Sequence, residues 1–129
     1  MKAANNLELL ATIQASVEEP FPLFIRIPAP LEPEDRVKRF DDPLEDTFEW
    51  TGVGVIVGGR TMRADAEDVE NQGVLFCGID VELYDLVRGV AEICTDLRRL
   101  EAPPGTALEF SLNGEPHALD IWESTEKLG

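Results

Sequence analysis

The segment from residue 74 to residue 100 constrains the fold most, because a strand pattern is followed directly by a helix pattern. Apolar and acidic residues alternate from Ile79 to Leu83, which is typical of a strand with one buried face. Asp85 is placed to cap a helix in which apolar residues recur at helical spacing as far as Leu100. We therefore predict a strand over 74–83 and a helix over 85–100. On the water-facing side of this helix we expect Arg88, Glu92, Asp96 and Arg99.

A second clear signal is the pair Asn113 and Gly114 between two apolar segments. Asn-Gly is the preferred sequence for a two-residue turn between antiparallel strands. We predict a hairpin with strands over 107–112 and 116–122.

The amino-terminal half gives weaker patterns. Apolar spacing predicts a helix over 5–17 and a strand over 23–27, and the prolines around that strand favour an edge of the sheet or a strand end. The proline-rich and acidic segment 28–46 is typical of a surface loop. We predict another strand over 48–57, where glycines alternate with valines, and a second loop over 59–73.

These elements predict one domain, over residues 1–129, of the α+β class. We expect a mostly antiparallel sheet of four to five strands with two helices packed on one face. The length of 129 residues suits a single domain with a substantial core.

Strand alternation assigns the expected strand residues to two faces of the sheet. The face under the helices should hold Val53, Val55, Val57, Leu75, Cys77, Ile79, Val81, Leu83, Leu108, Phe110, Leu112, Leu119 and Ile121. The opposite face should hold Phe48, Trp50, Phe76, Asp80, Glu82, Glu109, Asp120 and Trp122. Aromatic side chains among carboxylates on an open face are typical of an interaction site. The alternative is that the segment 28–46 or the amino terminus covers these aromatic side chains.

Charge limits the partners of such a face. The chain has 26 Asp and Glu residues against 11 Lys and Arg residues, a formal net charge of −15. This charge disfavours nucleic acids and anionic membranes and favours a basic protein partner. Alternatively, the excess of acid only keeps the protein soluble. We expect the cytoplasm, because no amino-terminal signal pattern is present and no apolar run approaches the roughly 18 residues that span a bilayer.

No pattern in the chain supports a specific catalytic or cofactor site. Asp80, Glu82, Glu109 and Asp120 form a possible divalent-metal cluster, but their spacing matches no known metal loop. The glycines after Val53 lack dinucleotide-binding spacing, and the lone His117 has no evident nucleophile partner. Cys77 and Cys94 fit buried, reduced thiols. We therefore expect a protein that is not an enzyme and needs no cofactor.

Two segments carry a resemblance to a known class of proteins. Residues 78–83, followed by a capped helix and then residues 103–110, resemble the carboxy-terminal half of small acidic bacterial immunity proteins, which are encoded beside secreted toxins. The resemblance implies tight inhibition of a toxin in the cytoplasm of the producing cell, and it assigns no residue roles.

The function predicted from these features is an acidic inhibitory module that binds a basic protein, with immunity to a toxin as the leading case. The alternatives are a structural subunit of a larger assembly and a small carboxylate-dependent metal enzyme. The predicted partner-binding residues are Trp50, Phe76, Asp80, Glu82, Glu109, Asp120 and Trp122, with Asp65, Glu67 and Asp68 of the 59–73 loop.

Overall fold

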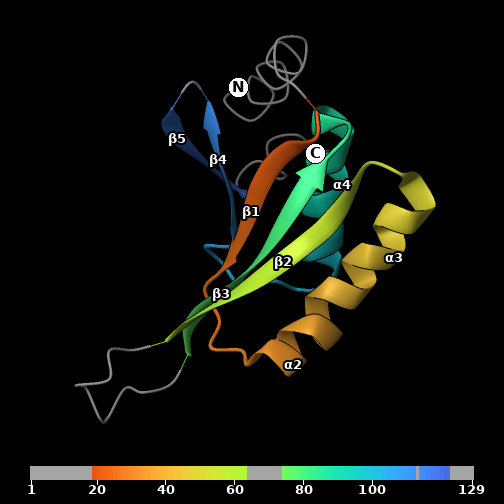
Figure 1. Cartoon of the computed structure of the whole chain (residues 1–129). Helices are drawn as coiled ribbons and strands as arrows, with labels where there is room; N and C mark the ends of the chain where they lie inside the picture. Colours follow the sequence, from red (N-terminus) through yellow and green to blue (C-terminus); the bar gives the residue numbers. More distant parts are fainter. Residues whose placement is uncertain (1–18, 64–73, 113, 123–129) are drawn as a thin grey trace.

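The computed structural model describes residues 19–63, 74–112 and 114–122, which form a sheet with helices on one side (Figure 1). Five antiparallel strands stand in the order β2-β3-β1-β4-β5. Their bounds are β1 Phe21–Ile27, β2 Gly54–Arg63, β3 Val74–Leu83, β4 Ala107–Leu112 and β5 Glu115–Asp120. The predicted α+β class and antiparallel sheet are confirmed. The helix predicted over 5–17 lies outside the described residues.

Strand β1 lies in the middle of the sheet, so of the two alternatives predicted from its prolines the sheet edge was wrong, whereas Pro22 and Pro28 do stand at the ends of the strand. It pairs with β3 over all seven residues, but with β4 only over Phe24–Arg26. Pro22 and Pro28 flank this doubly paired stretch. A proline lacks the N–H group that a ladder on both sides requires, and the prolines therefore limit how far the second ladder extends without excluding β1 from the centre.

The segment predicted as a surface loop over 28–46 is largely helical, and this prediction was also wrong. Helix α2 (Pro33–Arg36), the π-helical turn η1 (Val37–Asp41) and helix α3 (Asp42–Thr51) follow one another without a break. Pro33 stands at the start of α2, where its missing N–H group costs nothing. Pro43 would obstruct a regular helix, and just before it the N–H group of Asp42 donates to the Val37 carbonyl, five residues back. The wider turn accommodates the proline.

Because α3 extends to Thr51, the strand predicted over 48–57 starts only at Gly54. Phe48 is buried in the core and Trp50 is exposed on α3, so neither lies on the sheet. Gly54 and Ile56 pair with the buried Leu83 and Val81, so strand alternation turns Val55 and Val57 outward, against the prediction. Residues 59–63 continue β2 instead of forming a loop.

Helix α4 (Leu86–Arg99) follows β3 as predicted, and the Asp85 carboxylate accepts a hydrogen bond from the Arg88 N–H group at its start. One outward residue was assigned wrongly. Asp96 is buried, because its carboxylate accepts hydrogen bonds from Thr47 of α3 and from Arg99. The bond from Thr47 ties α3 to α4, and the bond from Arg99 lies within α4.

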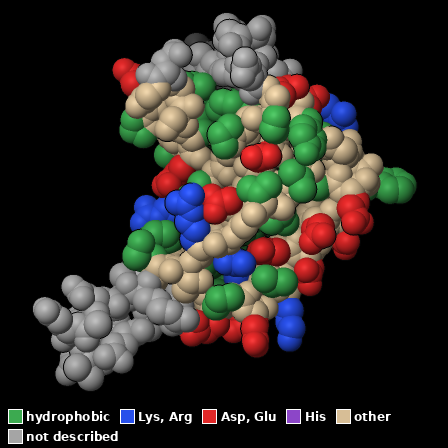
Figure 2. Space-filling view, in the orientation of Figure 1, with side chains coloured by type: hydrophobic (Ala, Val, Ile, Leu, Met, Phe, Trp, Pro, Cys, Tyr) green, Lys and Arg blue, Asp and Glu red, His purple; other side chains and the backbone are tan. Residues whose placement is uncertain are grey.

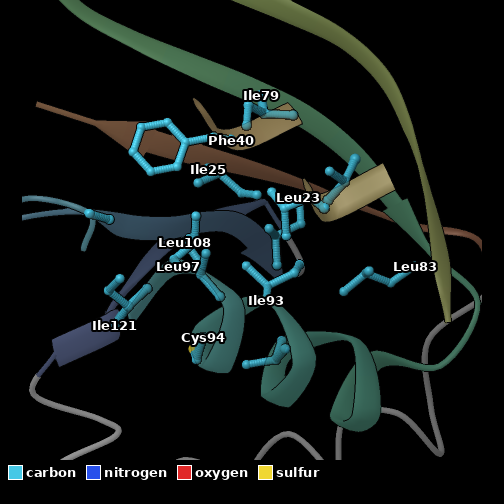
Figure 3. Close-up of a cluster of buried hydrophobic side chains, with 14 of the residues drawn as sticks. Leu23, Ile25, Phe40, Ile79, Leu83, Ile93, Cys94, Leu97, Leu108 and Ile121 are labelled. Atoms are coloured by element: carbon cyan, nitrogen blue, oxygen red, sulfur yellow. The ribbon is translucent and has the colours of Figure 1, made fainter. Parts of the chain in front are cut away.

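The core lies between the sheet and the helices (Figure 3). Ile25 of β1, Ile79 of β3 and Leu108 of β4 face Ile93 and Leu97 of α4, and all five are fully buried. Phe40, Leu44 and Phe48 add the second helical segment to the same cluster, and Cys77 and Cys94 are buried free thiols, as expected. The helices therefore share one face of the sheet, as predicted.

A buried ion pair fastens the helical segment 33–51 to β2. The Arg36 guanidinium donates from Nε and Nη2 to the two carboxylate oxygens of Asp41, at 3.1 and 3.3 Å, and Nη1 donates to the Arg60 carbonyl at 3.5 Å. The group lies against Gly59, where a β-carbon would overlap it. Glycine at this position leaves room for a buried arginine at the start of the helix.

Removal of Arg36 should destabilise the fold in a pH-dependent way. Burial raises the pKa of Asp41 above its ordinary value of 3.8, although Arg36 lowers it in part. Because the pKa of Asp41 is higher in the folded than in the unfolded protein, protonation of Asp41 stabilises the fold below pH 3.8. This stabilisation is lost as the pH rises through the pKa of Asp41 in the folded protein. We expect Arg36→Met to lose about 3–5 kcal/mol of unfolding free energy at pH 8, where the unpaired carboxylate is charged, and less at pH 5.

Urea unfolding of wild type and variant at both pH values measures this difference. The double variant Arg36→Met/Asp41→Asn is the control, and its loss of stability should not depend on pH. An equal loss for Arg36→Met at pH 8 and pH 5 would contradict the role assigned to the pair.

Candidate protein-binding surface

The outer face of the sheet, opposite α3 and α4, is not covered by any described helix (Figure 2). From the strand registers it comprises Val55, Gly58, Arg60, Met62, Phe76, Gly78, Asp80, Glu82, Pro22, Phe24, Arg26, Ala107, Glu109, Ser111, Pro116, Ala118 and Asp120, and Val57, at the register shift of β2, lies on the same side beside Phe24 and Asp80. Figure 2 shows apolar, basic and acidic side chains interspersed on this side of the molecule.

The centre of the outer face is a stack of an arginine on a phenylalanine. Arg60 makes a bidentate pair with Asp80, with distances of 3.0 Å from Nε to Oδ2 and 2.9 Å from Nη2 to Oδ1. The same guanidinium lies 4.8 Å from the Phe24 ring centroid. Phe24 in turn covers Gly78, where any β-carbon would overlap the ring. Glycine at 78 therefore lets an aromatic side chain lie flat on an otherwise open face.

A second arginine, on β1, repeats the arrangement on the other side of β3. Arg26 lies 4.4 Å from the Phe76 ring centroid, and its Nη1 is 4.0 Å from Glu109 Oε2. Both arginines on the outer face are thus held by an aromatic ring and an acid of the protein itself. The outer face as listed holds these two cations and four carboxylates, which belong to Asp80, Glu82, Glu109 and Asp120. Within the described residues, Glu82 has no ion pair. The face therefore keeps a negative balance that favours a cationic partner.

A shallow groove crosses the outer face at the centre of the sheet. Phe24, Val57, Asp80, Glu82 and Glu109 contribute to its lining. Arg60 also lines the groove and pairs with Asp80, so Glu82 and Glu109 are the carboxylates placed to meet the charged end of a lysine or arginine from a partner, whose aliphatic stem can lie on the apolar lining.

Exposed apolar side chains gather beside this groove, along β2 and just before it. The large hydrophobic residues exposed within the described part of the chain are Trp50, Val55, Val57, Met62 and Tyr84. Four of these five come from residues 50–62. Val57 and Met62 are 54% and 48% exposed, and this edge strand therefore presents apolar surface that the described core does not use.

The structure brings together only part of the predicted site. Phe76, Asp80, Glu82, Glu109 and Asp120 share the outer face, and the Asp120 carboxylate, on the edge strand β5, accepts a bond from the Trp122 N–H group. The remaining residues lie elsewhere: Trp50 is on α3, Trp122 packs on the core, and Asp65, Glu67 and Asp68 are outside the described residues.

Trp122 was expected on the open face because β5 was extended to residue 122. The strand ends at Asp120, and the indole Nε1 of Trp122 donates to the Ala102 carbonyl at 2.9 Å. Arg98 lies 5.4 Å from the Trp122 ring centroid. Trp122 is therefore a packing residue of the α4 end of the core.

Sequence reasoning missed Phe24, Arg26 and Arg60, which organise the outer face. The alternation in β1 was a usable signal for the first two, since Leu23, Ile25 and Ile27 are buried and the residues between them must face the other way. No local signal distinguishes Arg60, because its orientation follows from the register shift in β2.

The described residues do not assemble the metal cluster or the catalytic histidine site that were considered from the sequence. No three of their His, Cys, Asp or Glu side chains are grouped so as to hold a metal ion. Asp80 is engaged by Arg60, and Asp120 on β5 lies three strands away from Asp80 and Glu82 on β3. His117 stacks on Phe110 with ring centroids 5.7 Å apart. No helix within the described residues is long and apolar enough to cross a membrane.

Comparison of the chain with protein-family models, curated proteins and solved structures gives no significant match. A function for this chain therefore rests on the features of its surface.

The two tryptophans should differ sharply in their contribution to stability. Trp50 is 88% exposed, so Trp50→Ala should change the unfolding free energy by less than about 0.5 kcal/mol. Trp122→Ala removes core packing and the bond to Ala102, and it should cost about 2 kcal/mol. Urea unfolding of both variants measures the difference, and equal losses would contradict the placement of the two rings.

Proposed function

We propose that this protein is an acidic inhibitory module that binds a basic protein through the outer face of its sheet, with immunity to a secreted toxin as the leading case. The observation that carries the proposal is the uncovered outer face, with its apolar β2 edge and its carboxylate-lined groove. The net charge of −15 and the resemblance of residues 78–110 to immunity proteins support the choice of a basic partner.

Inhibition would follow from geometry and charge together. Val57 and Met62 supply the surface that loses water on contact, which gives most of the affinity. Glu82 and Glu109 pair with cationic side chains of the partner, which steers association and selects against acidic proteins. A basic toxin uses such cations to hold a nucleic acid or another anionic substrate, and a sheet face seated on them would block that substrate.

The proposal predicts a specific complex that depends on the outer face. Proteins encoded beside this chain would be produced and tested for binding and for loss of their own activity. We expect one of them to be inhibited at a 1:1 ratio. Val57→Ser/Met62→Ser should weaken binding by at least about tenfold, mainly through faster dissociation. Glu82→Lys should instead slow association and reduce its salt dependence.

Ala91→Ser, at an exposed position of α4, is the control and should bind like wild type. Inhibition that is unchanged in the Val57→Ser/Met62→Ser variant would overturn the assignment of the outer face. Turnover of a substrate by the purified chain alone would overturn the inhibitory role. Self-association of the purified chain through β2 would favour the alternative of a structural subunit.

A further inference from the structure

Helix α3 presents a second surface that is chemically different from the outer face of the sheet. Its exposed residues follow helical spacing along one side, and we call the four acids the acidic stripe: Asp42, Glu45, Asp46 and Glu49. Trp50 follows the stripe at the carboxyl end of the helix and is 88% exposed. Phe48, on the opposite side, is buried in the core.

The acidic stripe is in part unfavourable to the helix that carries it. Asp42 and Asp46, like Glu45 and Glu49, stand one turn apart, where like charges repel each other. Glu49 lies in the last turn, where the helix dipole favours a cation, and that turn holds no basic residue. Within the described residues, none of these four acids forms an ion pair. Asp42 and Glu45 stand in the first turn, where the helix dipole favours acids, so the unfavourable part of the stripe is the like-charge repulsion and Glu49, which a cation from a partner would relieve.

Trp50 makes this surface more selective than a row of acids. Asp46 lies one turn before Trp50 and Glu49 directly precedes it, so carboxylates flank the indole along the helix. Beside them, a shallow groove between α3 and α4 is lined by Thr47, Thr51, Arg88 and Glu92 together with Asp46 and Trp50. Arg88 makes the groove itself less attractive to a cation than the stripe.

The combination of a flat aromatic ring and adjacent carboxylates discriminates between basic side chains. A guanidinium can stack on an indole while it donates two parallel hydrogen bonds to a carboxylate, whereas an ammonium group offers only a point charge. The acids recur with the pitch of a helix, and a partner helix with arginines one turn apart presents its cations at the same spacing.

We propose that the acidic stripe and Trp50 form a docking surface for an arginine-bearing helix of a basic protein. This surface does not include the outer face of the sheet, and the inference does not rest on the function proposed for that face.

Two synthetic helical peptides test the proposal with the intact chain. They are identical alanine-rich sequences that carry either arginine or lysine at three positions one turn apart. Calorimetric titration at low ionic strength should show the arginine peptide binding about fivefold more tightly than the lysine peptide. Trp50→Ala should reduce this ratio to about one. Asp46→Asn/Glu49→Gln should weaken both peptides by about fivefold or more.

The charge-matched control is Glu34→Gln/Asp35→Asn, which removes two exposed acids from α2. It should leave both affinities within about twofold of wild type. Equal weakening by this control, or an arginine preference that survives Trp50→Ala, would overturn the proposal. Val57→Ser/Met62→Ser should not change peptide binding, so that failure of this surface and failure of the outer face can be told apart. Circular dichroism of each variant confirms that the helices are retained.

Discussion

The buried pair of Arg36 and Asp41 is the interaction on which the arrangement of both surfaces depends. Two charges removed from water are stable here only because each satisfies the other and because a third bond reaches the Arg60 carbonyl of β2. The pair holds the helical segment 33–51 on the core side of the sheet. As a result, the segment does not cover the outer face, and α3 turns its acidic stripe and Trp50 to solvent.

The outer face is ordered by its own side chains. Arg60 and Arg26 lie on Phe24 and Phe76, and each is also paired with an acid. These contacts shield part of two aromatic rings that would otherwise face water, and they hold the long arginine side chains in place before any partner arrives. A surface organised in advance loses less conformational entropy on binding. The parts of the outer face that remain for a partner are the apolar edge of β2 and the weakly paired or unpaired carboxylates, chiefly that of Glu82.

Elements whose sequence signals lie within a few residues were predicted correctly, and elements that depend on contacts between distant segments were not. Strand β3, the Asp85 cap and the Asn113-Gly114 hairpin follow from alternation and turn chemistry within a few residues, and they were predicted correctly. The segment 33–51 was not, because Pro33 and Pro43 normally argue against a helix, and the π turn that accommodates Pro43 has no simple sequence signature. The outward turn of Val55 and Val57 depends on the pairing of β2 with β3, in which Gly54 stands opposite Leu83, and no local pattern specifies this pairing. Parity placed Phe76, Asp80, Glu82 and Glu109 correctly, whereas Trp50 was misplaced with its helix.

The central claim is that the outer face is open in the free protein and becomes buried in a complex. Met62 reports on it directly, because its side chain lies on the outer face and is 48% exposed. Its rate of oxidation by dilute hydrogen peroxide can be measured by oxidising the chain, alone and with an inhibited partner, and then digesting it for mass spectrometry, which separates Met62 from Met1. The account predicts a rate within about threefold of that of a free methionine peptide, and slowing by about tenfold or more in the complex. A slow rate in the free chain, or an unchanged rate in the complex, would contradict it.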